Sequence, residues 1–136
     1  MIAALILVIS VAALLQFFVS YCRAVIAAYS KVELSPQARD VTGIHSHTAQ
    51  SEEFGRLAQL VQLCPEPGDD KFEIRAIGGY YRLLTFLRAA ARELAPAVVS
   101  WAERERQGCA YFAAVALDRR IAYSRDLMAQ QMSNRL

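Results

Sequence analysis

The sequence predicts an all-α protein in which a single N-terminal transmembrane helix with a protruding stalk is followed by a small antiparallel helical hairpin or three-helix bundle. Three observations predict this class. No charged residue occurs before Arg23. The remaining chain places apolar residues at the three- and four-residue steps of amphipathic helices. No segment outside these helical patterns shows the alternation of apolar and polar residues that marks a strand.

Composition narrows the class of protein further. Hydrophobic residues make up 55% of the 136 residues, above the roughly 45–50% that is usual in soluble domains, and this share excludes a disordered chain. A net charge of +2 is too small to indicate nucleic acid as the partner. The 3 cysteines are too few for a disulfide framework. A small, membrane-associated helical protein remains.

The uncharged segment from Met1 to Cys22 is long enough to cross a membrane. As an α-helix it rises roughly 33 Å, against a hydrocarbon core of about 30 Å. A cleaved signal peptide would begin with basic residues and have a shorter apolar core of about 7–15 residues. A lipoprotein signal would need a small residue before Cys22, where the chain has Tyr21. We therefore expect an uncleaved membrane anchor.

The charges that flank this segment predict its orientation. No basic side chain precedes the segment, and three follow it: Arg23, Lys31 and Arg39. The positive-inside rule then places the N-terminus outside and the following domain in the cytoplasm. Free cysteines suit this reducing compartment, and the chain has Cys22, Cys64 and Cys109. We expect a single-pass protein of the inner (cytoplasmic) membrane.

Residues 1–34 are expected to form the anchor and its stalk, because no helix-breaking residue occurs before Ser35-Pro36. One helix over this range would be roughly 50 Å long. Ser35 is a suitable N-cap and Pro36 suits the first helical position. A short helix is therefore expected to begin there and to end at Gly43, within a linker that covers residues 35–50.

Residues 51–136 are expected to form the cytoplasmic helical domain. Helical periodicity runs over residues 54–64, over about 70–94 and from 97 to about 132. A proline-rich loop separates the first two of these helices, and an Ala-Pro pair separates the last two. Cys109–Leu117 is uncharged but too short to span a bilayer, so we expect it to be a buried stretch of helix. A core of this size is marginal by itself.

The membrane segment carries a ridge of mostly small or polar residues spaced by four. This small-residue ridge comprises Ala4, Val8, Ala12, Gln16, Ser20, Ala24 and Ala28. Small residues let two helices approach closely, and a glutamine near mid-membrane favours a polar partner. We expect the ridge to pack against a partner helix through Ala12, Gln16, Ser20 and Ala24. The alternative is a chance arrangement, because alanine is common in membrane helices.

The helix expected at residues 70–94 has an apolar face and an arginine face. The apolar face comprises Ile77, Tyr80, Leu83, Leu84, Leu87, Ala90, Ala91 and Leu94. The opposite face carries Arg75, Arg82, Arg88 and Arg92. Such a face suits anionic lipid headgroups or an acidic partner protein. A solvated face that nearby acidic residues partly balance is the alternative.

Charged residues interrupt the apolar stripe of the last helix. Glu105 and Arg120 fall on this stripe, and we expect their long side chains to reach solvent at its rim. Pairing with another subunit is the alternative, because an unpaired buried charge costs several kcal/mol. Asp118 and Asp126 lie among arginines and are expected to form ion pairs with them.

The sequence contains no pattern that indicates catalysis. His45 and His47 are the only histidines, and a metal site needs three or four ligands. We expect them to lie in a surface linker, although a single histidine also suffices as an axial ligand to a pigment or haem. Nucleophile, phosphate-loop and zinc-protease motifs are absent from the sequence. We therefore expect a non-enzyme without a cofactor.

These features favour an accessory or structural subunit of a larger membrane protein complex. The anchor would supply one packing helix, and the cytoplasmic domain would brace a partner. Self-association through the same ridge is a variant that the sequence leaves open. The main alternative is a membrane-tethered binding or regulatory module that recruits a soluble partner. An enzyme or a cofactor-binding subunit is the third interpretation.

Overall fold

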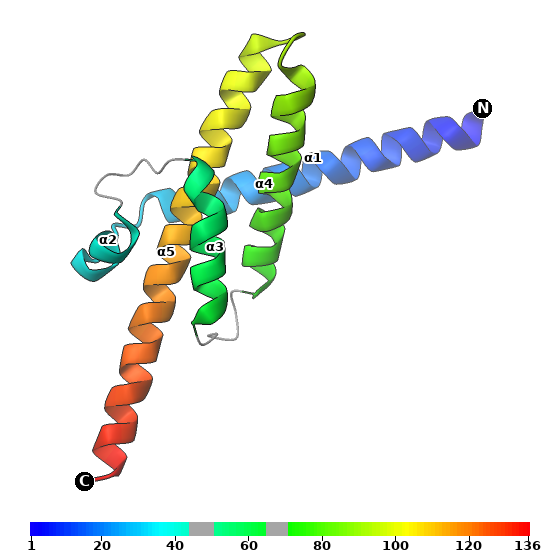
Figure 1. The fold of residues 1–136 in the computed structure, drawn as a ribbon. Helices are drawn as coiled ribbons and strands as arrows, with labels where there is room; N and C mark the ends of the chain where they lie inside the picture. The colour runs from blue at the N-terminus through cyan, green and yellow to red at the C-terminus, as the bar shows by residue number, and fades with distance from the viewer. Residues whose placement is uncertain (44–50, 65–70) are drawn as a thin grey trace.

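The described part of the chain is helical, and no strand occurs in it (Figure 1). The computed structural model describes residues 1–43, 51–64 and 71–136. The helices are α1 (Ile2–Ser30), α2 (Pro36–Thr42), the short 3-10 helix η1 (Ser51–Glu53), α3 (Phe54–Leu63), α4 (Lys71–Ala91) and α5 (Pro96–Asn134). The predicted all-helical class and the long apolar N-terminal helix are confirmed.

The longest helix, α5, is the axis on which the other helices pack (Figure 1). Its central stretch, Cys109–Leu117, is buried on all sides, as the uncharged run predicted. Side chains there include four alanines, which allow neighbouring helices to approach the α5 backbone closely. They are Ala110, Ala113, Ala114 and Ala116. This stretch therefore contacts several elements at once.

Helix α4 is joined to α5 by a tight turn, and the two helices run side by side in opposite directions (Figure 1). Its buried face consists of Ala76, Ile77, Tyr80 and Leu84. The helix ends at Ala91 and not at Leu94, because the residue before a proline disfavours helical dihedral angles and Ala95 precedes Pro96. Leu94 is consequently 88% exposed, so its predicted place on the buried face is wrong.

The C-terminal end of α3 is held by Arg120, which is only 2% exposed. Its Nη1 donates to the carbonyl oxygen of Val61 at 2.6 Å and to that of Cys64 at 3.4 Å. The last carbonyls of a helix have no partner within it, and the guanidinium supplies the missing donors. The prediction that Arg120 reaches solvent is wrong, because α3 covers it and satisfies it.

Helix α2 begins and ends as its sequence predicted. The Oγ of Ser35 accepts a hydrogen bond from the Ala38 amide at 3.3 Å, and Gly43 ends the helix in the left-handed region at φ 71°, where glycine is favoured. Asp118 of α5 accepts from the Ser35 hydroxyl at 2.7 Å and from its amide at 3.0 Å. Asp118 therefore positions this cap, whereas an ion pair with an arginine was expected.

Helix α1 does not form a protruding stalk at its C-terminal end. It ends at Ser30 and not at about Leu34. Its second half crosses the α4–α5 pair and packs against both helices (Figure 1), and Cys22 and Tyr29 are buried there. Residues 2–17 are exposed and project away from the other helices. Val25, Ile26 and Tyr29 of the expected stalk thus pack in or against the core.

The crossing of α1 over α5 depends on Gly108. A Cβ atom at this position would lie 2.7 Å from the Cγ2 of Ile26. Because Cγ2 is bonded directly to the Cβ of a stiff, β-branched side chain, rotation about a distal bond does not relieve the overlap. The two backbones approach this closely only because residue 108 has no side chain.

We predict that Gly108→Ala lowers the free energy of unfolding by about 1–3 kcal/mol, the usual cost of overpacking. The matched control is Gly78→Ala, since a Cβ there meets nothing within 4 Å and alanine favours helix by about 1 kcal/mol. Thermal unfolding in detergent, followed by circular dichroism, measures both variants. Equal stability of Gly108→Ala and wild type would show that α1 does not pack on α5 at this point.

Candidate functional site

The first charged residue after the apolar run is attached to the helical body. Nε of Arg23 lies 3.7 Å from Oε1 of Glu105, whose side chain is 17% exposed. The hydroxyl of Tyr80 donates to Oε2 of the same carboxylate at 2.9 Å. Burial, and then the hydrogen bond to Glu105, raise the pKa of Tyr80, which keeps it a donor. This cluster joins α1, α4 and α5.

A second cluster ties down the C-terminal end of α1. The hydroxyl of Tyr29 donates to Oε2 of Glu73 at 2.6 Å and accepts from Nη1 of Arg119 at 2.7 Å. The Arg119 guanidinium also lies over the Tyr29 ring, 4.4 Å from its centroid, and the ring packs on Phe112 at 4.6 Å. Both ends of the packed half of α1 therefore have polar contacts as well as apolar ones.

Two cysteines are sealed between these clusters. Cys22 and Cys109 are both fully buried, and the Cys22 thiol lies 3.8 Å from the carbonyl oxygen of Ala76. Burial, and then the charge of Glu105, raise the pKa of Cys109. A neutral buried thiol is a poor nucleophile, so this cysteine acts as a small apolar side chain.

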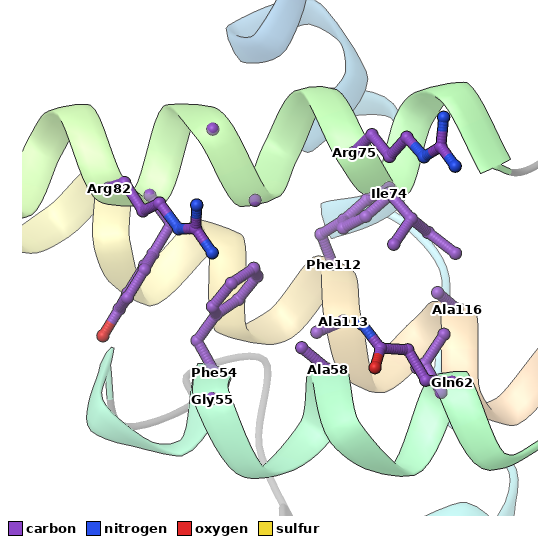
Figure 2. Close-up of a pocket in the computed structure, with 14 residues that line it drawn as sticks. Phe54, Gly55, Ala58, Gln62, Ile74, Arg75, Arg82, Phe112, Ala113 and Ala116 are labelled. Atoms are coloured by element: carbon purple, nitrogen blue, oxygen red, sulfur yellow. The ribbon is translucent and has the colours of Figure 1, made fainter.

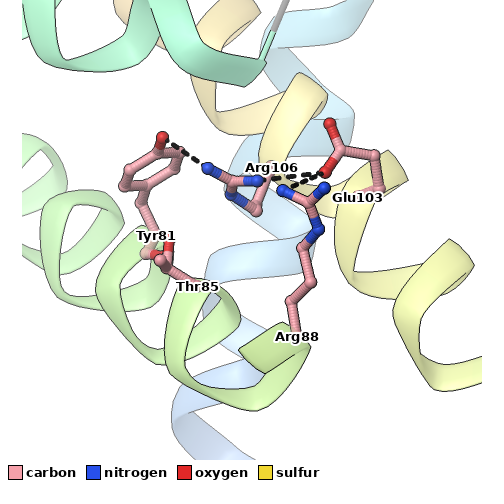
Figure 3. Close-up of polar contacts among 5 residues, drawn as sticks. All are labelled: Tyr81, Thr85, Arg88, Glu103 and Arg106. Atoms are coloured by element: carbon pink, nitrogen blue, oxygen red, sulfur yellow. Dashed lines mark hydrogen bonds and ion pairs between the residues drawn. The ribbon is translucent and has the colours of Figure 1, made fainter. Parts of the chain in front are cut away.

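Arg106, which the sequence pattern did not single out, is one of the two buried arginines among the described residues (Figure 3). It is 5% exposed. Nη2 donates to the Tyr81 hydroxyl at 2.9 Å and Nη1 donates to Glu103 at 3.0 Å, and Arg88 approaches the same carboxylate at 3.2 Å. Burial lowers the pKa of Arg106, but Tyr81 and Glu103 outweigh this effect and raise it.

One signal in the sequence places Arg106 in the core. Ala102, Arg106 and Cys109 follow one another at helical steps of four and three, so the arginine lies on the same stripe as two buried residues. Its Nε has no hydrogen-bond partner among the described residues. The remaining contacts of Arg106 are therefore costly to lose.

The part of the small-residue ridge formed by Gln16, Ser20 and Ala24 lies on the side of α1 that faces away from the body. The body contacts α1 through Phe18, Cys22, Val25 and Tyr29, which form one helical face. All seven ridge residues are exposed, and Gln16, Ser20 and Ala24 lie roughly opposite that face at 100° per residue. Helix packing within the chain thus leaves the ridge accessible, and its packing against a partner helix stays a prediction.

The four predicted arginines are exposed, but they do not form one continuous row. Arg75 and Arg82 are seven residues apart on one side of α4, next to a groove between α3 and α4. Arg88 and Arg92 are turned about 120° away from them and line a different hollow. Arg88 is also paired with Glu103. Only Arg75 and Arg82 lie together on the side of α4 that faces this groove.

The groove between α3 and α4 has a volume of about 550 Å³ (Figure 2). Phe112, Ala113 and Ala116 of α5 form its floor, and Phe54 and Ile74 lie on its walls. Its size is within the range of roughly 300–1,000 Å³ that is typical of ligand sites. The lining is mainly apolar, and it contains no group with the geometry of a nucleophile and a base.

No group of three potential metal ligands occurs among the described residues. His45 and His47 lie outside those residues, so their predicted place in a linker and their capacity as axial ligands stay untested. Helix α1 is the described helix that is long and apolar enough to cross a membrane. No protein family, curated protein or solved structure matches this chain.

We predict that Tyr81→Phe lowers the free energy of unfolding by about 1–3 kcal/mol, because the variant keeps the ring but leaves a buried donor of Arg106 without its acceptor. Tyr123→Phe is the matched control, since Tyr123 is 38% exposed, and should change stability by less than about 0.5 kcal/mol. Chemical denaturation in detergent compares the two. Equal losses would contradict the role assigned to the Tyr81 hydroxyl.

Proposed function

We propose that the chain is a non-catalytic accessory subunit of a larger membrane protein complex, in which α1 is a single transmembrane helix. The observation that carries this proposal is the position of the small-residue ridge. The body occupies one face of α1, and the ridge with Gln16 remains exposed on the other. On an apolar membrane helix, an exposed glutamine is favoured when a partner helix satisfies its amide group.

The energetics of membrane helices support this interpretation. Lipid tails solvate apolar side chains as well as another helix does, so association depends on close packing and hydrogen bonds. A glutamine contact across two helices contributes roughly 0.6–2 kcal/mol. Ala12 and Ser20, one turn on either side of Gln16, let a second backbone come close. A partner subunit or a second copy of the chain satisfies these requirements.

The body would lie on the cytoplasmic side of the inner membrane. Arg23, Lys31 and Arg39 follow the apolar segment, which favours this orientation under the positive-inside rule. The α4–α5 hairpin with α3 would then form a small helical bundle directly at the membrane. Because the packed half of α1 is part of its core, the body would transmit the position of the anchor without a flexible joint.

The second candidate function is a membrane-tethered module that recruits a soluble partner. The groove between α3 and α4 favours it, because an apolar floor between two helices accommodates an apolar side chain or helix from another protein. Under this alternative the partner is soluble and binds the body. Under the main proposal the partner is a membrane protein that binds α1.

We predict that a tagged chain, purified from native membranes in mild detergent, brings down larger membrane proteins in fixed stoichiometry. Ala12→Leu fills the ridge and Gln16→Leu removes its polar group, so both should reduce recovery of these proteins. Ala13→Leu is the matched control: it makes the same change at the same depth, about 100° around the helix. Quantitative mass spectrometry measures the recovered proteins.

The outcomes separate the candidate functions. Recovery of the chain alone as a monomer, or of a soluble protein whose amount is unaffected by the ridge variants, would overturn the accessory-subunit proposal. A soluble partner lost on Ala58→Phe, which narrows the groove, would establish the tethered module. A homo-oligomer that Ala12→Leu dissociates and Ala13→Leu does not would identify a second copy as the partner.

A further inference from the structure

The free part of α1 is too short to hold the body away from a membrane. Residues 2–17 project from the other helices, and 16 residues of α-helix rise about 24 Å, against a hydrocarbon core of about 30 Å. Beyond them, Phe18 packs edge-on against Tyr80 at 6.4 Å and Tyr21 against Phe72 at 5.9 Å. Part of α4 therefore lies beside the last turns of the apolar segment.

Two exposed phenylalanines flank the point at which α1 leaves the body. Phe72 is 70% exposed and Phe86 is 71% exposed. Together with Gly79 they are spaced by seven residues, so they form one line along α4. Gly79 is the midpoint, and a Cβ there would touch the Phe18 ring at 3.8 Å. The α1 helix thus passes α4 between two aromatic side chains that are both largely exposed.

A positive row lies next to this aromatic line. Arg75 and Arg82 are each three residues beyond Phe72 and Gly79, on an adjacent strip of α4. Both are exposed, and no carboxylate in the described part of the chain forms an ion pair with either of them. In contrast, Arg88 is held by Glu103 and is not part of this row.

The outer side of α4 also faces the direction in which α1 projects. In Figure 1, α4 lies between α5 and the free half of α1. A membrane crossed by α1 would therefore meet α4 before it meets α5. Aromatic side chains concentrate at the boundary between headgroups and acyl chains, and basic side chains near that surface bind anionic lipids.

We propose that α4 is an interfacial helix that seats the body on the anionic lipid surface of the membrane that α1 crosses. Phe72 and Phe86 enter the headgroup–acyl boundary, and Arg75 and Arg82 bind lipid phosphates. The proposal rests on the transmembrane role proposed for α1. Of the two partners predicted for this arginine pair, anionic lipid and an acidic protein, it selects lipid. An amphipathic helix in the plane of the interface combines the same two features.

Fluorescence quenching by brominated lipids tests, in the full-length chain, whether α4 lies at the membrane interface. This interfacial position of α4 is called the seat below. The chain is reconstituted into phosphatidylcholine vesicles that contain phosphatidylglycerol, in a Trp101→Phe background whose helicity is verified first. Bromines near the headgroup should quench strongly in Phe86→Trp. They should leave emission unchanged in Met128→Trp, because Met128 is exposed on the far end of α5. Equal emission changes at the two positions would overturn the seat.

A third reporter distinguishes failure of the seat from failure of the anchor. Ile9→Trp lies within the free half of α1 and should be quenched by bromines deep in the acyl chains. Deep quenching at position 9 without shallow quenching at position 86 overturns the seat and leaves the transmembrane role intact. Absence of quenching at both positions overturns both proposals.

The role of charge is tested with paired arginine variants. Arg75→Ala with Arg82→Ala should reduce quenching at position 86 severalfold in vesicles with phosphatidylglycerol and bring it to the level seen in pure phosphatidylcholine. Arg104→Ala with Arg125→Ala removes the same charge from exposed positions of α5 and should change nothing. Equal quenching with and without the anionic lipid, or equal effects of the two pairs, would overturn the preference of Arg75 and Arg82 for anionic lipid.

Discussion

The structure depends on one buried stretch of helix, Cys109–Leu117 of α5. It is uncharged, and its alanines present little more than backbone to their surroundings. Because small side chains let helices approach closely, α1, α3 and α4 all pack against this single helix. Gly108 immediately precedes this stretch. Because it has no side chain, α1 can cross close to the α5 backbone there. Larger residues here would separate the elements that α5 holds together.

Polar groups at the edges of this stretch determine which element packs where. Glu105 forms an ion pair with Arg23 of α1 and accepts a hydrogen bond from Tyr80 of α4. The next residue, Arg106, donates to Tyr81 of α4. About four turns further along α5, Arg120 donates to the end of α3. A buried polar group without its partner costs roughly 1–3 kcal/mol, so alternative arrangements of these helices are disfavoured. The apolar contacts supply stability, and these contacts supply specificity.

The sequence predicts elements whose signals are local and misses contacts between distant segments. The Ser35 cap, the Gly43 stop and the buried Cys109–Leu117 stretch follow from neighbouring residues and are found in the structure. The stalk was predicted because no helix breaker precedes Ser35, yet residues of α4 and α5 cover the second half of α1. Arg120 was expected at the surface because no neighbouring residue indicates a buried partner. The carbonyl oxygens that it contacts belong to residues more than fifty positions away.

The packing of α1 and the other helices into one unit is tested most directly by a disulfide between positions 26 and 108. The test uses Ile26→Cys with Gly108→Cys in a chain whose native cysteines are replaced by alanine. A Cβ at position 108 would lie 2.7 Å from the Cγ2 of Ile26, and a disulfide requires two Cβ atoms about 3.5–4.5 Å apart. We expect mild oxidation in native membranes to join the two cysteines, as a shift in gel mobility that reductant reverses. Ala24→Cys with Gly108→Cys is the control, in a chain where Ile26→Ala removes the overlap with residue 108, because residue 24 faces away from α5 and should give no bond. Absence of a bond between positions 26 and 108 would mean that α1 stands free as a stalk, and would contradict the account.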